Sequence, residues 1–452
     1  MIRALTKRIR LGAAFAALVG LVASGAPAQS AATPGVTKDT IVLGMTSAQS
    51  GAASPGYNKV GPAMKAYFDY INDKGGVFGR KIELKLEDDK YVPTNAVNKV
   101  NKLILRDKVF ALVGNLGTST HTAALKRTPI IKEQVPDLFV NTGFSGFANP
   151  KKYPTTFMYL PSYIMEAKVM SKYIKDKLPG KKVGILYQDD DFGKDGLAGF
   201  KAAGLTFVAG GTQRYASLSQ ATVGLGTQMT NLKNSGAEVI IIFGVTSATA
   251  AALRAASTIG FPATWRPQFI FGSVGADPTT LLTLARATTP ALQAATLASL
   301  TGAISLSFLP AATNDADEYI KEFKKINTAY NKAPAPQNAW DNNVLVGMNQ
   351  AMLVVQALRA AGENPTRASL MAALKSKGST FASAGYSKFD AANHVGYTGY
   401  WVGRFNSTGV IAPVDGGEPV VYTADSSTTN GDATLSTFKR PAVPADAIPT
   451  NS

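Results

Sequence analysis

The stretch from Ile41 to Asp89 constrains the fold most, because it reads as strand, turn, helix, turn and strand with no spare residues between them. Residues 40–44 are largely β-branched or apolar and predict a strand. The following apolar side chains recur at the spacing of one helix face: Met64, Tyr67, Phe68 and Ile71. Gly75 and Gly76 end that helix, and residues 82–87 then alternate between apolar and charged, as a half-buried strand does. The chain therefore opens with a β-α-β unit.

Strand-like and helical runs continue to alternate as far as Ser273. Short, bounded, apolar runs predict buried parallel strands at 109–113, 137–140, 182–187, 238–243 and 268–271. Helix-forming segments lie between them at 97–105, 164–177, 192–203, 227–234 and 248–259. This alternation predicts an α/β fold with doubly wound parallel sheets, and 452 residues are too many for one core. Such sheets bind ligands at the carboxyl ends of their strands, so we expect the functional residues in the strand-exit loops.

The turn residues of the opening unit carry a family resemblance. They fall in a fixed order: Ser50-Gly51, Ile71-Asn72, Gly75 to Arg80, Asp88-Asp89 and Pro93. With this order the chain resembles the leucine/isoleucine/valine-binding protein family, the periplasmic solute-binding proteins of ABC importers, over roughly 36–409. The resemblance implies two lobes joined by three hinge crossovers, near 160–161, 303–305 and 380, with the ligand cleft between the lobes.

The same resemblance implies the division of the chain. Lobe one is expected at 36–160 plus 305–379, and lobe two at 161–304 plus 380–410. Residues 411–452 are rich in Gly, Ser, Thr and Pro and bury little apolar surface. We therefore expect an irregular C-terminal tail there.

The first 28 residues predict a secretory signal peptide. They have a basic start, an apolar middle from Leu11 to Val22, and small residues up to Ala28. A membrane anchor is the alternative, but the apolar run is shorter than the about 20 residues that a bilayer requires. The sequence has no cysteine, which excludes disulfides, thiolate metal sites and a lipidated cysteine. We expect a periplasmic, non-lipidated protein.

The net charge of +16 makes the chain basic. Its lysines are scattered, without a run of five or six and without an aromatic stripe between them, so they are typical of a solvated surface. We therefore expect no nucleic-acid partner.

Thr118 and Ser119 follow a buried strand and open a helical segment. Hydroxyls at such a place serve either as ordinary helix caps or as a small anion site. The resemblance implies that the hydroxyl of Thr118 binds the carboxylate of the ligand. It also implies that the loop of Gly143 and Ser145 supplies a carbonyl and a second hydroxyl.

Further candidates line the expected cleft. The resemblance implies that the ring of Phe192 closes over the ligand from lobe two, although a hydrophobic staple at a helix start is the alternative. Tyr57 and Trp340 border the cleft in the same way, or are simple packing residues. Thr246 lies in a strand-exit loop.

Ser273 marks a departure from the family. Amino-acid-binding relatives place an acid near this position to pair with the ammonium group of the ligand, whereas no carboxylate lies between Glu238 and Asp277 here. A buried ammonium without a partner costs several kcal/mol. We therefore expect a small carboxylate-bearing ligand, with an amine-free acid favoured over an amino acid.

Enzymatic motifs are weak. The two histidines, His121 and His394, are far apart in sequence, and the acids at 189–191 lack the spacing of a calcium loop. No nucleophile elbow or phosphate-binding loop occurs, so we expect no catalysis, no metal and no cofactor. The expected partners are the small ligand and the membrane subunits of an ABC permease. A sensor of the same fold and a secreted hydrolase are the alternatives.

Overall fold

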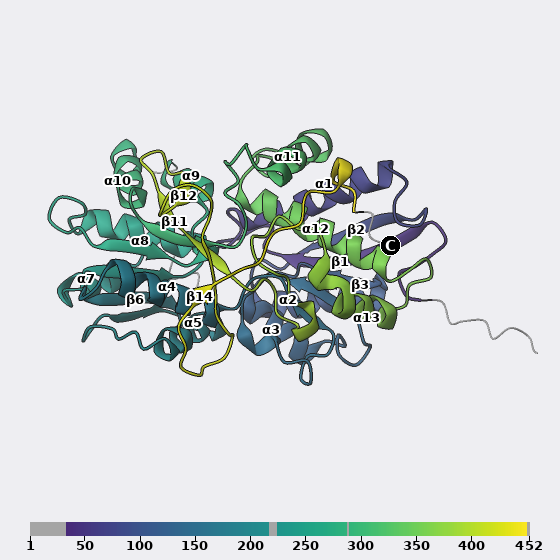
Figure 1. The fold of residues 1–452 in the computed structure, drawn as a ribbon, viewed down its shortest axis with the longest axis horizontal. Coiled ribbons are helices and arrows are strands. Elements are labelled where there is room, and N and C mark those ends of the chain that lie inside the picture. The colour runs from purple at the N-terminus through teal and green to yellow at the C-terminus, as the bar shows by residue number, and fades with distance from the viewer. Residues whose placement is uncertain (1–32, 217–223, 287–288, 450–452) are drawn as a thin grey trace, which may run out of the picture. The chain divides into compact units, whose positions relative to one another are not determined.

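The computed structural model of the chain describes residues 33–216, 224–286 and 289–449 (Figure 1). The predicted signal peptide at 1–28 lies outside the described residues. Among the described residues, no helix is both long enough and apolar enough to cross a membrane.

The first lobe is built on a parallel sheet of five strands in the order β2-β1-β3-β4-β5. The strands are β1 (Thr40–Ser47), β2 (Lys81–Asp88), β3 (Ala111–Val113), β4 (Asp137–Val140) and β5 (Thr156–Met158). Its helices are α1 (Val60–Asp73), α2 (Pro93–Asn101), α3 (Thr118–Arg127), α11 (Glu318–Tyr330), α12 (Asn342–Ala360) and α13 (Arg367–Lys377). Ile41 pairs with Ile82, so the two strands predicted at the start of the chain are neighbours.

The face of α1 that the sequence predicted is buried. Met64, Tyr67, Phe68 and Ile71 are each at most 1% exposed. Helix α12 packs closely along α1, and a Cβ atom on Gly347 of α12 would lie 2.4 Å from the Val60 carbonyl oxygen. This close approach joins α12, far along the chain, to the first lobe.

The second lobe contains a mixed sheet in the order β14-β13-β11-β10-β9-β8-β6-β7, with β12 paired to β11. The parallel strands are β6 (Val183–Gln188), β7 (Thr212–Tyr215), β8 (Val239–Phe243), β9 (Gln268–Phe271) and β10 (Ile304–Ser307). The antiparallel strands are β11 (Tyr400–Phe405), β12 (Ile411–Pro413), β13 (Val421–Thr423) and β14 (Thr434–Leu435).

The helices of the second lobe are α4 (Tyr163–Lys177), α5 (Asp191–Ala202), α7 (Gly226–Asn234), α8 (Thr246–Thr258), α9 (Pro278–Arg286) and α10 (Pro290–Leu300). One-turn helices are η1 (Tyr57–Lys59), η3 (Ser145–Phe147), η4 (Ser273–Gly275), η5 (Gly378–Thr380), η6 (Ala391–Asn393) and η7 (Ala445–Ala447), and a π-helical turn, η2 (Lys102–Arg106), extends α2. The α/β class with two doubly wound lobes is confirmed.

The sheets locate the passages between the lobes. The chain enters the second lobe between β5 and α4, returns to the first lobe after β10, and reaches the second sheet again at β11. Because β10 pairs with β9 and β11, residues 304–307 belong to the second sheet rather than to the start of the returning segment. The His394 carbonyl accepts from the Met158 N–H, so the chain still lies beside β5 well after Thr380. The remaining lobe boundaries stay a prediction.

The C-terminal tail is more ordered than its composition suggested. Strands β12, β13 and β14 extend the second sheet, because β11 offers an edge with which short segments can pair. The chain then runs back to the first lobe, where the Tyr67 hydroxyl donates to the Ala447 carbonyl (2.6 Å). In Figure 1 this segment is the yellow trace that leaves β14 and ends beside α1. The prediction of an irregular tail is therefore wrong for the three strands at 411–413, 421–423 and 434–435.

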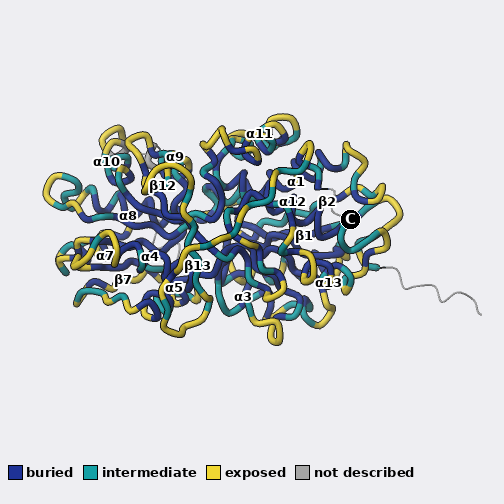
Figure 2. The backbone as a smooth tube through the Cα atoms, viewed as in Figure 1, coloured by how far each residue is buried: buried dark blue, intermediate teal, exposed yellow. Residues whose placement is uncertain are grey.

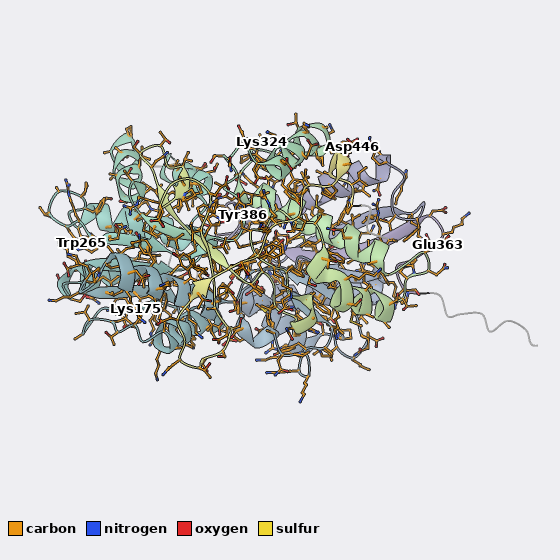
Figure 3. The ribbon with its side chains drawn as sticks, in the orientation of Figure 1. Lys175, Trp265, Lys324, Glu363, Tyr386 and Asp446 are labelled. Carbon is orange, nitrogen blue, oxygen red and sulfur yellow. The ribbon has the colours of Figure 1, made fainter. Side chains whose placement is uncertain are left out.

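Buried backbone is concentrated in the two sheets and on the inner faces of the helices (Figure 2). Some charged side chains lie on the outside, as Lys175 and Glu363 do (Figure 3). Many surface lysines have an acid beside them, as Lys175 has Asp432 (2.9 Å) and Lys65 has Asp69 (2.6 Å). This supports the expectation of a mixed, solvated surface.

Candidate functional site

Two adjacent cavities lie where the strand-exit loops of the two lobes meet. The smaller one, the aromatic cavity, has a volume of about 30 Å³. It is lined by Tyr57, Tyr91, Leu116, Gly117, Asn141, Tyr163, Phe192, Val245 and Val274. The larger one, the hinge cavity, has a volume of about 100 Å³ and lies against the interlobe passage at 305–311. Tyr57, Asn141 and Val274 line both, so the two cavities share a wall at the place where an α/β fold binds its ligand.

Tyr57 connects the lobes at this wall. Its hydroxyl donates to the Val274 carbonyl (2.6 Å), and the Thr246 hydroxyl lies 3.3 Å from the same oxygen. Burial raises the pKa of Tyr57 to about 12, so the hydroxyl remains a hydrogen-bond donor at neutral pH. The hydroxyls of Tyr57 and Thr246 thus meet at the Val274 carbonyl oxygen.

Phe192 forms the floor of the aromatic cavity. It is 1% exposed, and its ring centroid lies 4.6 Å from that of Tyr163 and 4.9 Å from that of Phe243. The ring sits at the start of α5, where Asp190 caps the helix by accepting from the Phe192 and Gly193 N–H groups. Phe192 therefore contributes an apolar wall to the cavity.

Thr118 lies beside the aromatic cavity without capping its own helix. It is buried, and its hydroxyl is 2.7 Å from that of Thr142. The Thr142 hydroxyl in turn lies 3.3 Å from the Tyr163 hydroxyl and accepts from the Phe144 N–H. The ordinary capping alternative is not seen, since no side-chain bond caps the helix start at Gly117. Ser119, the next residue, is half-buried.

Gly143 and Ser145 already have partners within the protein. The Gly143 carbonyl accepts from the Tyr163 N–H (2.7 Å), and a Cβ atom there would lie 2.4 Å from the Pro161 carbonyl oxygen, so only glycine fits. The N–H and hydroxyl of Ser145 both donate to the carboxyl group of Asp195 in α5, at 2.9 and 2.5 Å. Burial raises the pKa of Asp195 to about 6. Ser145 therefore joins the two lobes in this structure.

Trp340 lies apart from both cavities. Its indole N–H donates to the Ala312 carbonyl (2.8 Å), and the Lys324 ammonium lies 5.8 Å from its ring centroid. It lines a separate hollow with residues of the 311–313 segment. The alternative that Trp340 is a packing residue is the one these contacts favour.

Ser273 has an acid beside it after all. Its N–H donates to the Glu166 carboxyl group (2.5 Å), and the Tyr400 hydroxyl lies 3.4 Å from the other oxygen of that group. Glu166 is fully buried, which raises its pKa to about 7. Asp277, four residues after Ser273, also lines the hinge cavity. The premise that this region has no acid was wrong, because Glu166 approaches from a helix 107 positions earlier.

A family model described as periplasmic binding protein matches residues 40–410. The chain belongs to the periplasmic binding protein family. The resemblance drawn from its turn residues is therefore confirmed.

Curated relatives of this binding protein match over part of their length. An amino acid binding protein of Pseudomonas aeruginosa is 29% identical over 210 residues, which are 45% of this chain and 54% of that protein. The Leu/Ile/Val-binding protein homolog 3 of Brucella melitensis is 26% identical over 208 residues, with the same shares covered. The chain thus spans about half the length of the curated relatives it matches.

Solved structures share the fold of this binding protein across both lobes. A branched chain amino acid ABC transporter protein from Thermus thermophilus with bound valine has a TM-score of 0.71 at 19% identity, covering 86% of this chain and 98% of that one. A fatty acid ABC transporter substrate-binding protein from Thermomonospora curvata has a TM-score of 0.69 at 22% identity, covering 84% and 93%. These likenesses show the fold.

The histidines of this periplasmic binding protein are structural. His121 Nε2 lies 2.7 Å from Asp137, and both side chains are buried in the first lobe. His394 Nδ1 lies 2.8 Å from the Thr156 carbonyl oxygen. Neither histidine lines either cavity. Within the described ranges no cluster of three or more potential ligands holds the geometry for a metal ion.

Sequence reasoning missed several residues of the site: Tyr91, Asn141, Tyr163, Glu166, Asp195 and Asn343. Asn141 opens a strand-exit loop, so its position was a usable signal. Tyr91 follows β2 in the same way, with a positive φ of 59°. The other four lie on helices, where nothing local distinguishes a residue that faces a cavity from one that faces the core.

Proposed function

We propose that this chain is an extracytoplasmic solute-binding protein of an ABC importer, which captures a small carboxylate-bearing solute by hinge closure and performs no chemistry. The observation that carries the proposal is the pair of cavities walled by residues of both lobes, with Tyr57 bonded across them to Val274. A ligand held there contacts both lobes and so stabilises their closed arrangement. The membrane subunits of a permease are the partner that such a protein serves.

The names of similar proteins support a ligand that carries a carboxylate group. One structural neighbour is named for fatty acids, another holds valine, and the curated relatives are named for amino acids. These ligands share a carboxylate attached to an apolar body. The lining of the aromatic cavity, which is aromatic and aliphatic with Asn141 and Gly117 as its remaining members, suits the apolar body.

Within this class we propose that an amine-free acid is favoured, because the aromatic cavity has no carboxylate on its wall to pair with an ammonium group. An amino acid is the second candidate, and a specific observation favours it: the Oδ2 atom of Asp277 is buried at the hinge cavity and has no hydrogen-bond partner among the described residues. An ionised Asp277 would be a counter-charge for an ammonium group.

A thermal-shift screen with matched pairs tests the proposal. Each pair differs only in the amine: 4-methylpentanoate with leucine, and 3-phenylpropanoate with phenylalanine, alongside fatty acids of increasing length. Stabilisation follows RT ln(1 + [L]/Kd), so weak binders are visible at high concentration. We expect the amine-free member to give the larger shift. A larger shift with the amino acid would select the second candidate, and no shift with any carboxylate would contradict the function itself.

A further inference from the structure

The hinge cavity has an apolar body and a polar end. Its apolar wall includes Leu160, Phe308, Leu309, Leu345, Val346 and Ile411. A single water needs roughly 10–15 Å³ of such space, so a cavity of about 100 Å³ has room for a small molecule. Its polar lining includes Asp277 and Asn343, from opposite lobes.

Among the residues that line the hinge cavity, three buried polar atoms have no hydrogen-bond partner among the described residues: Ser273 Oγ, Asp277 Oδ2 and Asn343 Nδ2. The last two come from opposite lobes. We call them the open pair. Asp277 is 7% exposed and Asn343 is 8% exposed, and both line the hinge cavity. Buried polar groups normally have partners, and leaving one without a partner is costly. The open pair therefore indicates a ligand that completes these bonds.

The protein holds the other oxygen of Asp277, and the Asn343 amide lies close to the turn at Gly56. Asp277 Oδ1 accepts from the Thr280 N–H (2.7 Å). The Asn343 amide nitrogen lies 2.8 Å from where a Cβ atom on Gly56 would stand, and Gly56 has a φ of 86°, so a larger residue at 56 would displace the amide. Asp277 is thus oriented before a ligand arrives, and Gly56 leaves room for the Asn343 amide.

Charged groups around Asp277 decide its protonation. Burial raises the pKa of Asp277, and the negative charge of Asp341 raises it further. Lys59 lowers the pKa of Asp277 by a smaller amount, and its ammonium is bonded to Asp341 (2.5 Å). The Tyr57 hydroxyl also faces this region and remains protonated. A neutral Asp277 carries a proton on one oxygen and can donate it in a hydrogen bond.

We propose that the hinge cavity binds the carboxylate of an amine-free apolar acid, with Asn343 Nδ2 donating to one ligand oxygen and protonated Asp277 donating through Oδ2 to the other. This inference rests on the proposed function and names the part of the cleft that holds the acid. Two carboxyl groups facing each other share one proton, since both cannot ionise at close range. Binding of the acid anion therefore requires Asp277 to hold a proton, and it takes up a proton from solvent whenever Asp277 is ionised beforehand.

Titration calorimetry of the full chain tests this assignment. The probe is the amine-free acid that gives the largest shift in a panel of 4-methylpentanoate, 3-phenylpropanoate and the even-numbered fatty acids from hexanoate to dodecanoate. Above the pKa of Asp277 we expect its affinity to fall about tenfold per pH unit, with about one proton taken up per ligand in buffers of different ionisation enthalpy.

Asp277→Asn distinguishes the two candidate ligands, because the amide keeps a donor and removes the charge. We expect this variant to bind the acid with an affinity that no longer changes with pH. Asn343→Asp replaces the amide donor with a carboxylate of similar shape. It should weaken binding of the acid at least tenfold. Asp415→Asn, on the exposed loop after β12, is the matched control and should behave as the parent chain.

Three outcomes overturn the assignment. If Asp277→Asn abolishes binding of leucine or phenylalanine, Asp277 is the counter-charge of an ammonium group. If the acid binds but both variants bind it as the parent chain does, the carboxylate lies elsewhere, and the proposed function survives without this subsite. If no acid of the panel binds at any pH, the proposed function fails with it.

Discussion

Ser145 shows how a single side chain separates two interpretations of the site. The family resemblance assigns its hydroxyl to the ligand, whereas the structure bonds it to Asp195 across the lobes. Ser145→Ala removes one of the two bonds to a buried carboxyl group, which costs about 1–3 kcal/mol. We expect a lower melting temperature of the unliganded protein, measured by calorimetry, and Ser407→Ala, at an exposed position in the turn after β11, is the control. If the variant keeps the stability of the unliganded protein but binds ligand more weakly, the Ser145 hydroxyl contacts the ligand.

Glu166 gives a prediction about pH. Burial raises its pKa from 4.5 to about 7. Between pH 4.5 and 7, Glu166 is therefore protonated in the folded state and ionised in the unfolded state. The contribution of Glu166 to stability is full below about pH 4.5 and is lost as the pH rises through about 7. The Glu166→Gln variant cannot ionise at this position. From pH 4.5 to 8 its free energy of unfolding should therefore rise, relative to that of the parent chain, by up to about 3 kcal/mol.

Urea denaturation at several pH values measures this difference. Glu238→Gln is the control, because Glu238 is exposed and its pKa is lowered by the Lys181 ammonium beside it. A difference between Glu166→Gln and the parent chain that stays constant with pH would show that Glu166 remains ionised in the folded state.

These two residues mark the limit of sequence reasoning. The loops of Thr118, Gly143, Ser145 and Phe192 were located because strand ends are readable from short apolar runs and the glycines that follow. Their partners were not, because Asp195 lies 50 positions from Ser145 and Glu166 lies 107 positions from Ser273. Such contacts depend on the packing of helices onto a sheet, which leaves no local pattern.

At the scale of elements, the longer buried units before Ser273 were predicted and short or exposed ones there were missed, while elements beyond it, such as the buried helix α12, were not predicted. The helix predicted at 192–203 is α5 at Asp191–Ala202, and the strand predicted at 238–243 is β8 at Val239–Phe243. Strand β7 was missed because Thr212–Tyr215 is polar and three of its four residues are not buried. An edge strand of this kind is defined by its neighbour, β6, rather than by its own periodicity.

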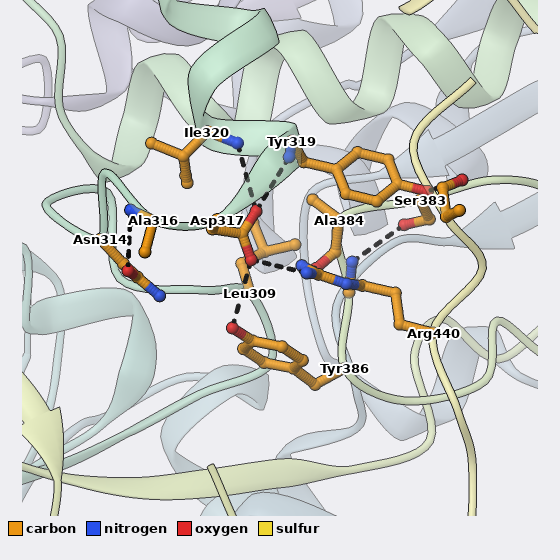
Figure 4. A network of polar contacts seen from close by, with 12 residues as sticks. Leu309, Asn314, Ala316, Asp317, Tyr319, Ile320, Ser383, Ala384, Tyr386 and Arg440 are labelled. Atoms are coloured by element: carbon orange, nitrogen blue, oxygen red, sulfur yellow. Dashed lines mark hydrogen bonds and ion pairs between the residues drawn. The ribbon is translucent and has the colours of Figure 1, made fainter. Parts of the chain in front are cut away.

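The C-terminal segment carries a prediction of its own at this scale. After β14 the chain crosses to the first lobe, where Arg440 donates to Asp317 (2.6 Å) and to the Ala384 carbonyl (3.1 Å), as Figure 4 shows. Asp317 also caps α11, and the guanidinium lies 4.9 Å and 4.7 Å from the ring centroids of Tyr319 and Tyr386. Arg440→Ala should lower the free energy of unfolding by about 2 kcal/mol, since it leaves a buried carboxylate short of a charged partner.

Chemical denaturation measures that loss, and Lys439→Ala is the matched control because its side chain is adjacent and exposed. Equal stability of the two variants would mean that the tail is dispensable for the first lobe. A loss confined to Arg440→Ala would confirm that 436–449 is part of the folded unit.

At the scale of the whole molecule, closure is the property that the proposed function requires. Several hydrogen bonds join the lobes among the described residues, including Tyr57 to Val274, Ser145 to Asp195 and Tyr163 to Gly143, and most of these residues lie in loops or near helix starts. Interfaces built from a few loop hydrogen bonds open readily, whereas a ligand that touches both walls adds the burial of its own apolar surface, at about 25 cal/mol per Å². The unliganded protein should therefore be more open on average than the liganded one.

Small-angle scattering measures this difference as a fall in the radius of gyration when a carboxylate ligand is added. Tyr57→Phe keeps the ring in the wall between the cavities and removes the bond to Val274, so the unliganded variant should start from a larger radius and still contract when ligand is added. Trp340→Phe is a control, because Trp340 bonds within its own neighbourhood at Ala312 and lines neither the aromatic nor the hinge cavity. If calorimetry shows a ligand bound while the radius of the parent chain stays constant, capture does not proceed by hinge closure, and the two cavities must admit their ligand through the closed arrangement.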